Sequence, residues 1–260
     1  KNPNAVIVVA PSDHHIEKED VFTEIISNGL KFVAENDKLL TIGIRPSSPN
    51  TGYGYIQYKE DTADKRFHSI YNVKLFTEKP ELEVAKQFVE SGEFLWNAGI
   101  FMWSLKNIEK AFERYLPEVN DLFKQGEGLY NTTAETNFIH ATYQVCRNIS
   151  IDYGVMEKAD NVCVYAADCG WSDLGTWGAL YEISEKDKEG NVIGGSRIKT
   201  YDTQNCIIKA PKNKAIVVQG LDNFIIVEND NVLLICSKEN EQQIRQYVND
   251  VQIDFGDKYI

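Results

Sequence analysis

The apolar positions of the chain switch between the spacing of a strand and that of a helix. Residues 5–10 are continuously apolar and rich in β-branched side chains, which predicts a strand buried on both faces of a sheet. Residues 19–35 carry apolar side chains at helical spacing, and residues 39–44 form a second apolar run. This order predicts a βαβ unit with a right-handed crossover, and therefore an α/β fold.

The same pattern predicts further elements as far as residue 186. Strands are expected at residues 53–58, 71–77, 94–103 and 161–167. Helices are expected at residues 80–90, where Pro80 would open the helix, at residues 106–115, and from Thr176 onward. The stretch 118–148 is expected to hold helical segments around a loop at residues 125–128.

The pattern changes after Lys186. Short β-like runs separated by turn residues follow, at residues 206–209, 215–218, 224–227 and 232–236, and a last helix is expected at residues 239–249. We therefore predict a domain boundary near residue 189. It divides a main α/β domain, residues 1–188, from a small β module with a terminal helix, residues 189–260.

Composition narrows the possible functions. The 260 residues include 27 basic and 39 acidic side chains, and the net charge of −12 argues against nucleic acid as a partner. A small phosphorylated substrate would need a local lysine or a cation to overcome this charge. No apolar run is long enough to span a bilayer and no signal peptide is apparent, so no membrane association is expected.

The five cysteines form no Cys-x-x-Cys pair. Their odd number in a chain of this size favours reduced thiols and a cytoplasmic protein over a disulfide framework. Zinc is not expected, because His14 and His15 are adjacent in sequence and adjacent residues rarely chelate one ion.

The segment GWSDLGTW, residues 170–177, is the first candidate site. It connects a predicted strand to a predicted helix, and α/β proteins bind their ligands in such turns. Taken alone, Asp173 is more typical of a helix N-cap than of a metal ligand. Asp13, which follows the first predicted strand, has the same ambiguity. Two aspartates at two strand ends of one sheet are more specific, because Mg²⁺ is often held by one or two carboxylates together with substrate phosphates.

A second candidate site combines charge with a buried amide. Glu78 and Lys79 lie between a predicted strand and a predicted helix, where Lys79 would bind a phosphate and Glu78 would accept hydrogen bonds from sugar hydroxyls. A surface ion pair or a solvated turn is an equally good interpretation. Asn97 lies inside an apolar strand and needs partners, either nearby backbone or a ligand in a pocket. Gly99 suggests close approach to the backbone, and Gly54 belongs to a loop that is either an ordinary turn or a set of ligand-facing amides.

In this order, these pieces resemble the mannose-1-phosphate guanylyltransferases, a branch of the sugar-nucleotide pyrophosphorylases, in their short form. The matching motifs within residues 5–177 are VIVVAPSDHHI, TGYGYIQY, FTEKP, FLWNAGIFMW, SIDYGVMEK and GWSDLGTW. The later stretches NVIGGSRIKTYDTQNCIIKA and VENDNVLLIC are also similar to the end of that form. FTEKP alone is weak, whereas SIDYGVMEK with GWSDLGTW points to the mannose branch.

The resemblance implies a Rossmann-like nucleotidyltransferase domain with a left-handed β-helix-like module. It also implies transfer of GMP from GTP to mannose 1-phosphate, with Mg²⁺. Residue by residue, Asp13 and Asp173 match the metal-binding, catalytic aspartates, and Lys79 matches the lysine that holds the sugar phosphate. Glu78 and Asn97 match residues that contact the hexose, and Gly54 matches a backbone contact to it.

One part of the family pattern is missing. The family begins with a strand and a Gly-rich loop, containing an Arg and followed by a Pro-Lys pair, that grips the nucleotide; no such segment is present. We therefore expect a fragment whose nucleotidyltransferase domain is incomplete at its N-terminal side and whose activity alone is weak or absent. The alternatives are a non-catalytic, sugar-nucleotide-binding regulatory relative and a nucleotidyltransferase for another sugar 1-phosphate. A homodimer is compatible with the apolar C-terminal strands, because edge strands need cover.

Overall fold

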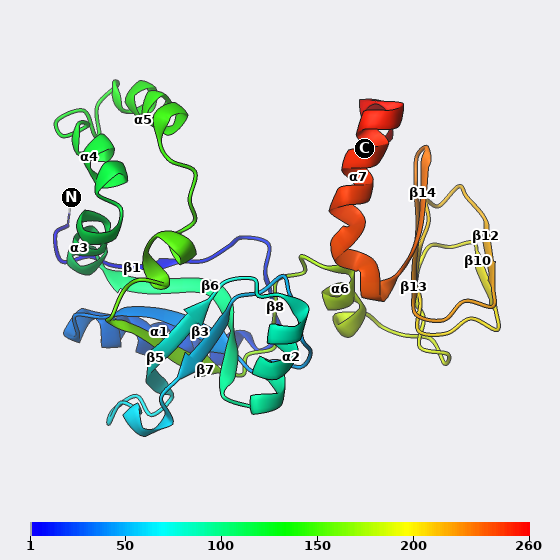
Figure 1. The fold of residues 1–260 in the computed structure, drawn as a ribbon, viewed down its shortest axis with the longest axis horizontal. Coiled ribbons are helices and arrows are strands. Elements are labelled where there is room, and N and C mark those ends of the chain that lie inside the picture. Colours follow the sequence, from blue (N-terminus) through cyan, green and yellow to red (C-terminus); the bar gives the residue numbers. More distant parts are fainter. Residues whose placement is uncertain (1) are drawn as a thin grey trace. The chain divides into compact units, whose positions relative to one another are not determined.

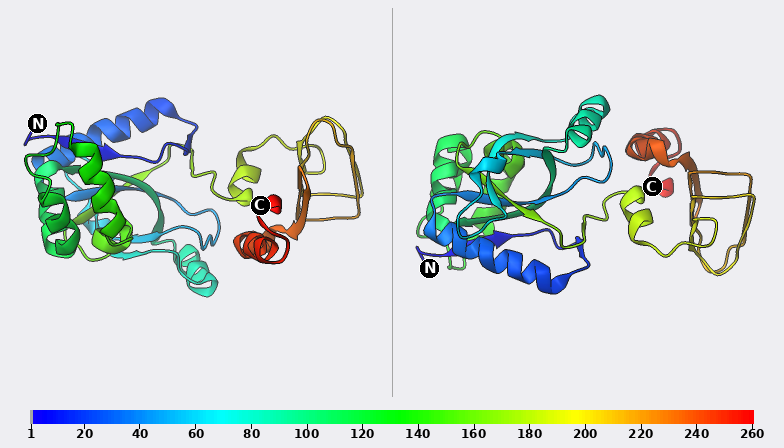
Figure 2. Two further views of the ribbon diagram at one scale, coloured as in Figure 1. Left: turned by 90° about the horizontal axis from the view of Figure 1, so that it is seen from above. Right: turned by 90° about the horizontal axis from the view of Figure 1, so that it is seen from below.

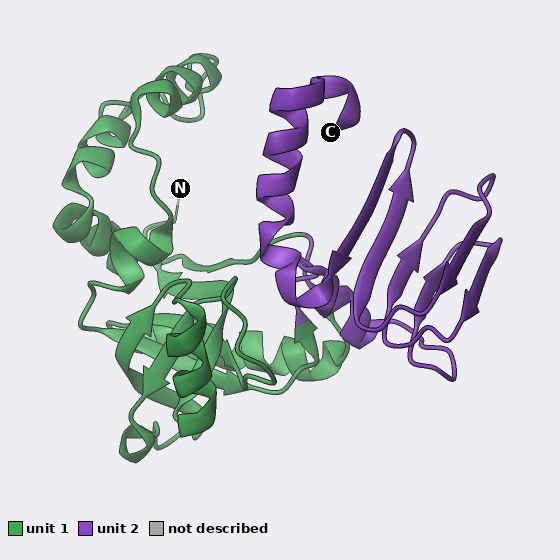
Figure 3. Cartoon of the chain, turned by 45° about the vertical axis from the view of Figure 1, so that its right-hand side comes forward, with its two compact units in different colours: residues 1–12, 16–171 green, residues 13–15, 172–260 purple. Residues whose placement is uncertain are grey.

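The computed structural model describes residues 2–260, which fall into two compact units (Figure 3). Unit 1 contains the described residues up to residue 12 together with residues 16–171. Unit 2 contains residues 13–15 and 172–260. The boundary predicted near residue 189 lies inside unit 2, and as a statement about domains it stays a prediction.

Unit 1 is built on a six-stranded sheet in the order β1-β6-β3-β7-β5-β4. Its strands are β1 (Val6–Val9), β3 (Leu39–Ile44), β4 (Tyr55–Tyr58), β5 (Ile70–Thr77), β6 (Phe94–Ser104) and β7 (Val162–Ala167). An additional β4–β6 pairing closes a ring of five strands. Strands β1 and β3 run in the same direction, because each is antiparallel to β6, which lies between them. The predicted βαβ unit is present, with β6 inserted between its two strands.

Strand β1 lies at the edge of this sheet, and the prediction that it is buried on both faces is wrong. Val6, Val8 and Val9 are 39%, 40% and 46% exposed. Within the described residues β1 pairs only with β6. A run of apolar residues shows that a strand is favoured, but it does not show which position the strand takes in the sheet.

The helices of unit 1 mostly begin and end where the apolar spacing predicts. They are α1 (Glu19–Glu35), α2 (Leu82–Ser91), α3 (Leu105–Tyr115), α4 (Pro117–Lys124) and α5 (Glu135–Val145), with two short helical segments at Glu60–Thr62 and Asp152–Met156. Helix α2 begins two residues after Pro80, with Glu81 at its N-cap, so the prediction that Pro80 opens this helix is wrong. Figures 1 and 2 show α1 and α3 on opposite sides of the sheet.

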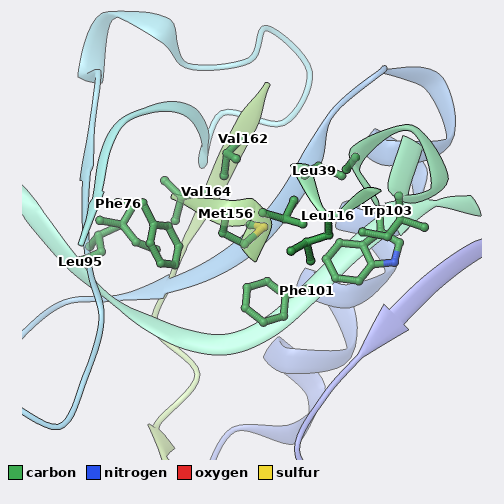
Figure 4. Packing of buried hydrophobic residues seen from close by; sticks show 13 residues of the cluster. Leu39, Phe76, Leu95, Phe101, Trp103, Leu116, Met156, Val162 and Val164 are labelled. Carbon is green, nitrogen blue, oxygen red and sulfur yellow. The ribbon is translucent and has the colours of Figure 1, made fainter. Parts of the chain in front are cut away.

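Successive residues of β3 enter different cores. Leu39 belongs to the cluster that includes Phe101 and Trp103 and is covered by α3 (Figure 4). Leu40 belongs to the cluster on the opposite face, with Ile25 and Phe32 of α1. Both leucines are fully buried, since side chains alternate across a strand and helices cover both faces here.

Unit 2 is a small β structure with two main helices. Its elements are α6 (Trp177–Ile183), β9 (Val192–Gly194), β10 (Ile198–Tyr201), β11 (Ile207–Lys209), β12 (Ile216–Gln219), β13 (Phe224–Asn229), β14 (Val232–Ser237) and α7 (Ile244–Phe255), with 3₁₀ helices η3 (Lys238–Gln243) and η4 (Asp257–Tyr259). The short strands β2 (His15–Ile16) and β8 (Trp171–Ser172) form a separate two-stranded sheet. Strands β9 and β10 were not among the predicted elements.

The strands of unit 2 stack as coils, as Figures 1 and 2 show. Three parallel pairs join residues 18 positions apart in sequence: Ile198 with Ile216, Gln204 with Asp222, and Ile207 with Ile225. Strand β9 pairs in parallel with β11, and β14 closes the sheet in an antiparallel hairpin with β13. Parallel stacking of successive coils confirms the predicted β-helix-like module, while the handedness of its coil stays a prediction.

Helices α6 and α7 cover the outer face of the coiled sheet. Ile207 and Ile225 face Trp177 of α6 and Ile244 of α7, whereas their neighbours point into the coil. Helix α6 was predicted within the main domain, yet its apolar side chains complete the core of unit 2. Within residues 2–260, every helix is too short or too polar to cross a membrane.

Candidate functional site

Glu78 and Lys79, which belong to the second candidate site of the sequence analysis, follow the last residue of β5. The backbone N–H of Lys79 donates to the Tyr53 carbonyl at 3.2 Å, and that of Glu78 donates to Glu157 Oε1 at 3.1 Å. Lys79 has a φ of 48°, a left-handed conformation that is unfavourable for a side chain with a Cβ. Both residues are therefore held in a defined turn at the end of the strand.

The two side chains differ in exposure. The Glu78 side chain is 10% exposed and the Lys79 side chain is 57% exposed, with Lys79 Nζ 3.5 Å from Glu78 Oε1. Oε2 of Glu78 has no hydrogen-bond partner among the residues that the structure describes. Burial, and secondarily the charge of Asp152, raises the pKa of Glu78 to about 7, against the opposing effect of Lys79. An ion pair is present, but it is not a solvated surface pair, because its acid is buried.

Gly54 makes room for this carboxylate. A Cβ at this position would lie 2.3 Å from Glu78 Oε2 and 3.2 Å from the Asn97 Cβ. The Gly54 carbonyl accepts a 2.8 Å hydrogen bond from the Asn97 backbone N–H. A glycine is therefore required here for Glu78 and Asn97 to approach one another.

The side-chain amide of Asn97 is held by three hydrogen bonds. Its Oδ1 accepts from Thr41 Oγ1 at 2.9 Å and from the Gly99 backbone N–H at 3.2 Å. Its Nδ2 donates to Asp152 Oδ1 at 2.9 Å. Asn97 is 8% exposed and Thr41 is fully buried, so the Asn97 amide is fixed in one orientation. The three hydrogen bonds leave one N–H of Nδ2 without an acceptor among them.

Gly99 serves the strand itself. Its φ is 66°, and the register of β3 against β6 shifts between Thr41 and Gly43. Gly99 therefore occupies a left-handed position at an irregularity of the ladder, where its N–H turns toward Asn97 Oδ1. Backbone conformation accounts for the glycine at this position, and close approach of another group to it stays a prediction.

These contacts define the Glu78 cluster: Gly54, Glu78, Lys79, Asn97 and Asp152, all in unit 1. Asp152 and Glu157 lie in the motif SIDYGVMEK and Thr41 lies in a predicted strand, but none of the three was assigned a role from the sequence. The Asp in SIDYGVMEK was a usable signal, since an acid within an apolar run needs a partner. Thr41 carried no such signal, because a threonine is ordinary in a strand.

The first candidate site of the sequence analysis lies in unit 2 and includes Asp13, His14 and Asp173. Burial lowers the pKa of His14, and the charges of Asp173 and Asp13 act in the opposite direction. Both carboxylates are thus close enough to act on one imidazole. Asp13 itself is exposed, between β1 and β2.

Asp173 is not the N-cap of α6. That position belongs to Thr176, whose hydroxyl accepts from the Ala179 N–H at 3.0 Å. Asp173 Oδ1 instead accepts from the Gly175 N–H at 3.0 Å, and Ser172 Oγ accepts from the Leu174 N–H at 3.3 Å. We call residues 172–178 the Asp173 segment. The N-cap interpretation of Asp173 is wrong, since a threonine three residues later fills that position.

The donor set fits a magnesium ion. Among residues 2–260, no three or more His, Cys, Asp or Glu side chains are grouped so that they would hold a metal ion on their own. Two carboxylates suit Mg²⁺, which takes oxygen ligands and keeps positions for water and substrate phosphate. The predicted site residues thus fall into two groups, one in each unit.

Known families match both units. Residues 1–190 match the family described as nucleotidyl transferase. Residues 196–251 match the family described as the MannoseP isomerase/GMP-like beta-helix domain. The two matches follow one another along the chain without overlap.

Curated relatives cover nearly the whole chain. A mannose-1-phosphate guanylyltransferase of Escherichia coli is 32% identical over 255 residues, which are 97% of this chain and 54% of that protein. One of Klebsiella pneumoniae is 33% identical over 244 residues, which are 94% of this chain and 51% of that protein. The chain spans about half the length of these relatives.

A solved structure has a similar fold. It is described as the crystal structure of a mannose-1-phosphate geranyltransferase from Thermus thermophilus. The match has a TM-score of 0.80 and 27% identity, and covers 95% of this chain and 70% of that one. Together with the family match over residues 1–190, it leaves one assignment: the chain belongs to the nucleotidyl transferase family.

Proposed function

We propose that this chain carries the chemistry of a mannose-1-phosphate guanylyltransferase. It would transfer GMP from GTP to α-D-mannose 1-phosphate, giving GDP-mannose and pyrophosphate. One observation carries the proposal: a buried carboxylate oxygen of Glu78, without a protein partner in the described residues, lies beside the exposed ammonium of Lys79. A hexose phosphate supplies a hydroxyl donor for Glu78 Oε2 and a further anion for the exposed ammonium of Lys79. The names of the relatives support mannose 1-phosphate as the acceptor and a guanylyl group as the group that is transferred.

The Glu78 cluster would bind the sugar phosphate. Lys79 would pair with its phosphate, and Glu78 would accept a hydrogen bond from a hexose hydroxyl. Asn97 would donate its remaining N–H to another hydroxyl, since Thr41 and Asp152 fix its amide. Gly54 would contribute through its backbone and through the space that its missing side chain leaves.

Asp13 and Asp173 would hold a divalent cation, which we propose to be Mg²⁺. Nucleotidyl transferases generally use a divalent metal. When bound, the ion would neutralise charge on the nucleotide phosphates. The two carboxylates suit this role because they provide hard oxygen donors in an otherwise acidic protein.

The reaction needs little from the protein beyond position and charge. An oxygen of the sugar phosphate, already an anion at neutral pH, forms a bond to the α-phosphorus of GTP, and the bond from that phosphorus to the bridging oxygen breaks. Pyrophosphate leaves with the bonding electrons, so no general base is required. Orientation by the Glu78 cluster and neutralisation by Lys79 are the contributions assigned to unit 1.

A pyrophosphate-release assay tests the proposal. We expect weak release that requires GTP, mannose 1-phosphate and Mg²⁺ together, and that is slower still with glucose 1-phosphate. Faster release with another sugar phosphate would support the alternative that the chain is a nucleotidyltransferase for another sugar 1-phosphate. Binding of GDP-mannose by calorimetry without any turnover would support the non-catalytic relative and contradict the proposal.

Lys79→Ala is the variant that tests the sugar-phosphate site directly. Losing a charge-assisted contact of about 1.5–3 kcal/mol should raise the KM for mannose 1-phosphate by roughly 10- to 100-fold. Lys74→Ala changes an exposed lysine on β5, the strand that precedes Lys79; it is the matched control and should leave this KM unchanged. A change confined to the KM for GTP would contradict the role given to Lys79.

Location and assembly complete the proposal. The cysteines are free thiols, which supports the reducing cytoplasm as the site of action. The homodimer stays a prediction; sedimentation of the purified chain measures it.

A further inference from the structure

The Asp173 segment is organised mainly by short-range contacts. Ser172, Asp173 and Thr176 each accept a hydrogen bond from a backbone N–H two or three residues later. Leu174 between them has a φ of 51°. Contacts of this length define the shape of a loop, and the pairing of β8 with β2 attaches its first residue, Ser172.

A long-range contact attaches the other end of the Asp173 segment. Oε2 of Glu241 accepts a 2.8 Å hydrogen bond from the Gly178 N–H, across 63 residues of sequence. Burial raises the pKa of Glu241, and the backbone of Trp177 also acts on this carboxylate, with the smaller and opposite effect of lowering that pKa. Glu241 belongs to η3, which connects the coiled sheet to α7, and it accepts from an N–H of the first turn of α6 that has no partner within the helix.

The fit around this contact is close. A Cβ on Gly178 would lie 3.3 Å from Glu241 Oε1, so the start of α6 rests directly against the carboxylate. In the same block, Lys238 Nζ lies 3.4 Å from the ring centre of Tyr181 on α6. Trp177 and Tyr181 also pack into the cluster that contains Ile244 of α7. Helix α6 and η3 therefore form one packed piece of unit 2.

We propose that Glu241 is a positioning residue for Asp173, through which the β module holds the metal-binding carboxylate in place. The inference deepens the proposed function, because it rests on Asp173 as a metal ligand. Asp173 lies five residues before Gly178, and the intervening residues are tied by the local hydrogen bonds above. A metal ligand acts well only when its own position is fixed, and removing the partner that fixes it typically weakens metal binding or activity about 10- to 100-fold.

The test measures Mn²⁺ binding to the full chain by electron paramagnetic resonance, with no substrate present. Glu241→Ala should weaken Mn²⁺ binding by about 10-fold or more. Glu241→Gln keeps an oxygen that accepts from Gly178 and should restore binding close to that of the parent. Glu239→Ala changes an exposed acid of the same 3₁₀ helix and should have no effect. Asp173→Asn provides the reference for a lost ligand.

Four outcomes decide the inference. Weak binding in Glu241→Ala with rescue in Glu241→Gln supports it. Unchanged Mn²⁺ binding in Glu241→Ala with a lower Tm overturns it, because Glu241 would then only stabilise the module. Equal weakening in the Ala and Gln variants also overturns it, because charge rather than hydrogen bonding would be responsible. If Glu241→Ala does not fold, Gly178→Ala, which crowds the same contact, should weaken Mn²⁺ binding, and an unchanged affinity there overturns it.

Activity separates this inference from the proposed function. If the parent chain releases no pyrophosphate with any sugar phosphate, the proposed function fails while Mn²⁺ binding still tests Glu241. If turnover is present, Glu241→Ala should raise the Mg²⁺ concentration needed for half-maximal rate and leave the KM for mannose 1-phosphate unchanged.

Discussion

The Glu78 cluster and the Asp173 segment hold their carboxylates in different ways. Glu78 and Asn97 are largely buried and lie at or near strands of one sheet. A hydrogen bond from Thr41 and another to Asp152 hold the side-chain amide of Asn97 in place. Asp173 lies on a short connection, where turn hydrogen bonds shape the backbone and Glu241 anchors the helix that follows. Buried polar networks are costly to disturb, whereas a surface segment is attached through a few contacts.

This difference separates two kinds of damage. Changes in the Glu78 cluster should reduce stability and sugar-phosphate binding together, because the same buried hydrogen bonds serve both. Changes in the Asp173 segment should reduce metal-dependent turnover with little loss of stability. The experiments below test that separation, beginning with the largest expected effect.

Asp173→Asn should have the largest effect on activity. Losing the carboxylate charge at the proposed metal site should lower Mg²⁺-dependent turnover by at least about 100-fold, with an unchanged Tm. Pyrophosphate release and thermal unfolding measure the two quantities. Asp168→Asn, at an acid 89% exposed in its ion pair with Lys18, is the control. Turnover within a few-fold of the parent would leave Asp173 with a structural role only.

Gly54→Ala should have the largest effect on stability. The new Cβ would lie 2.3 Å from Glu78 Oε2, and overpacking of this kind costs about 1–3 kcal/mol in the free energy of unfolding. Urea unfolding measures the loss, and the KM for mannose 1-phosphate should rise with it. The cost should shrink in a Glu78→Ala background, where the opposing oxygen is gone. An equal cost in both backgrounds would mean that the clash is not with Glu78.

Thr41→Val should give a smaller effect of the same kind. Valine keeps the shape of threonine but removes the donor to Asn97 Oδ1, which still accepts from the Gly99 N–H. The free energy of unfolding should fall by about 1 kcal/mol. The KM for mannose 1-phosphate should rise while Mn²⁺ affinity stays constant. Thr176→Ala, which removes the N-cap of α6, is the comparison in the Asp173 segment. It should lower the Mn²⁺ affinity and leave the KM for mannose 1-phosphate constant. The same pattern in both variants would contradict the separation of the two regions.

The pH dependence of stability should show the smallest effect. The pKa of Glu78 is raised to about 7 from its ordinary value of 4.5, so the folded protein holds this proton more tightly than the unfolded chain. The resulting stabilisation is fully present below about pH 4.5 and is lost as the pH rises through about 7. Unfolding across this range should therefore depend less on pH in Glu78→Gln than in the parent. Glu83→Gln, at a largely exposed acid, should leave the dependence unchanged.

Much of the fold follows from local patterns in the sequence. The apolar spacing of α1 predicts its residues correctly from Glu19 to Glu35, because one face of a helix repeats every 3–4 residues. Strand β3 is predicted equally well. The same patterns misplace β1 in the sheet and overlook β9 and β10, whose short apolar runs are interrupted by Gly194 and by Lys199 and Thr200. Strands β11 and β12 are equally short, but their apolar runs are continuous enough to be predicted.

The candidate site, like the fold, follows from the sequence only in part. Local motifs in the sequence identify Asp13, Glu78, Lys79, Asn97 and Asp173 as candidates and show which family they resemble. Folding adds the contacts among them: Thr41 and Asp152 hold Asn97, Gly54 gives space to Glu78, and Glu241 is bonded to the start of α6. These contacts join residues 24 to 63 positions apart, and local patterns do not reveal them because only packing brings such residues close together.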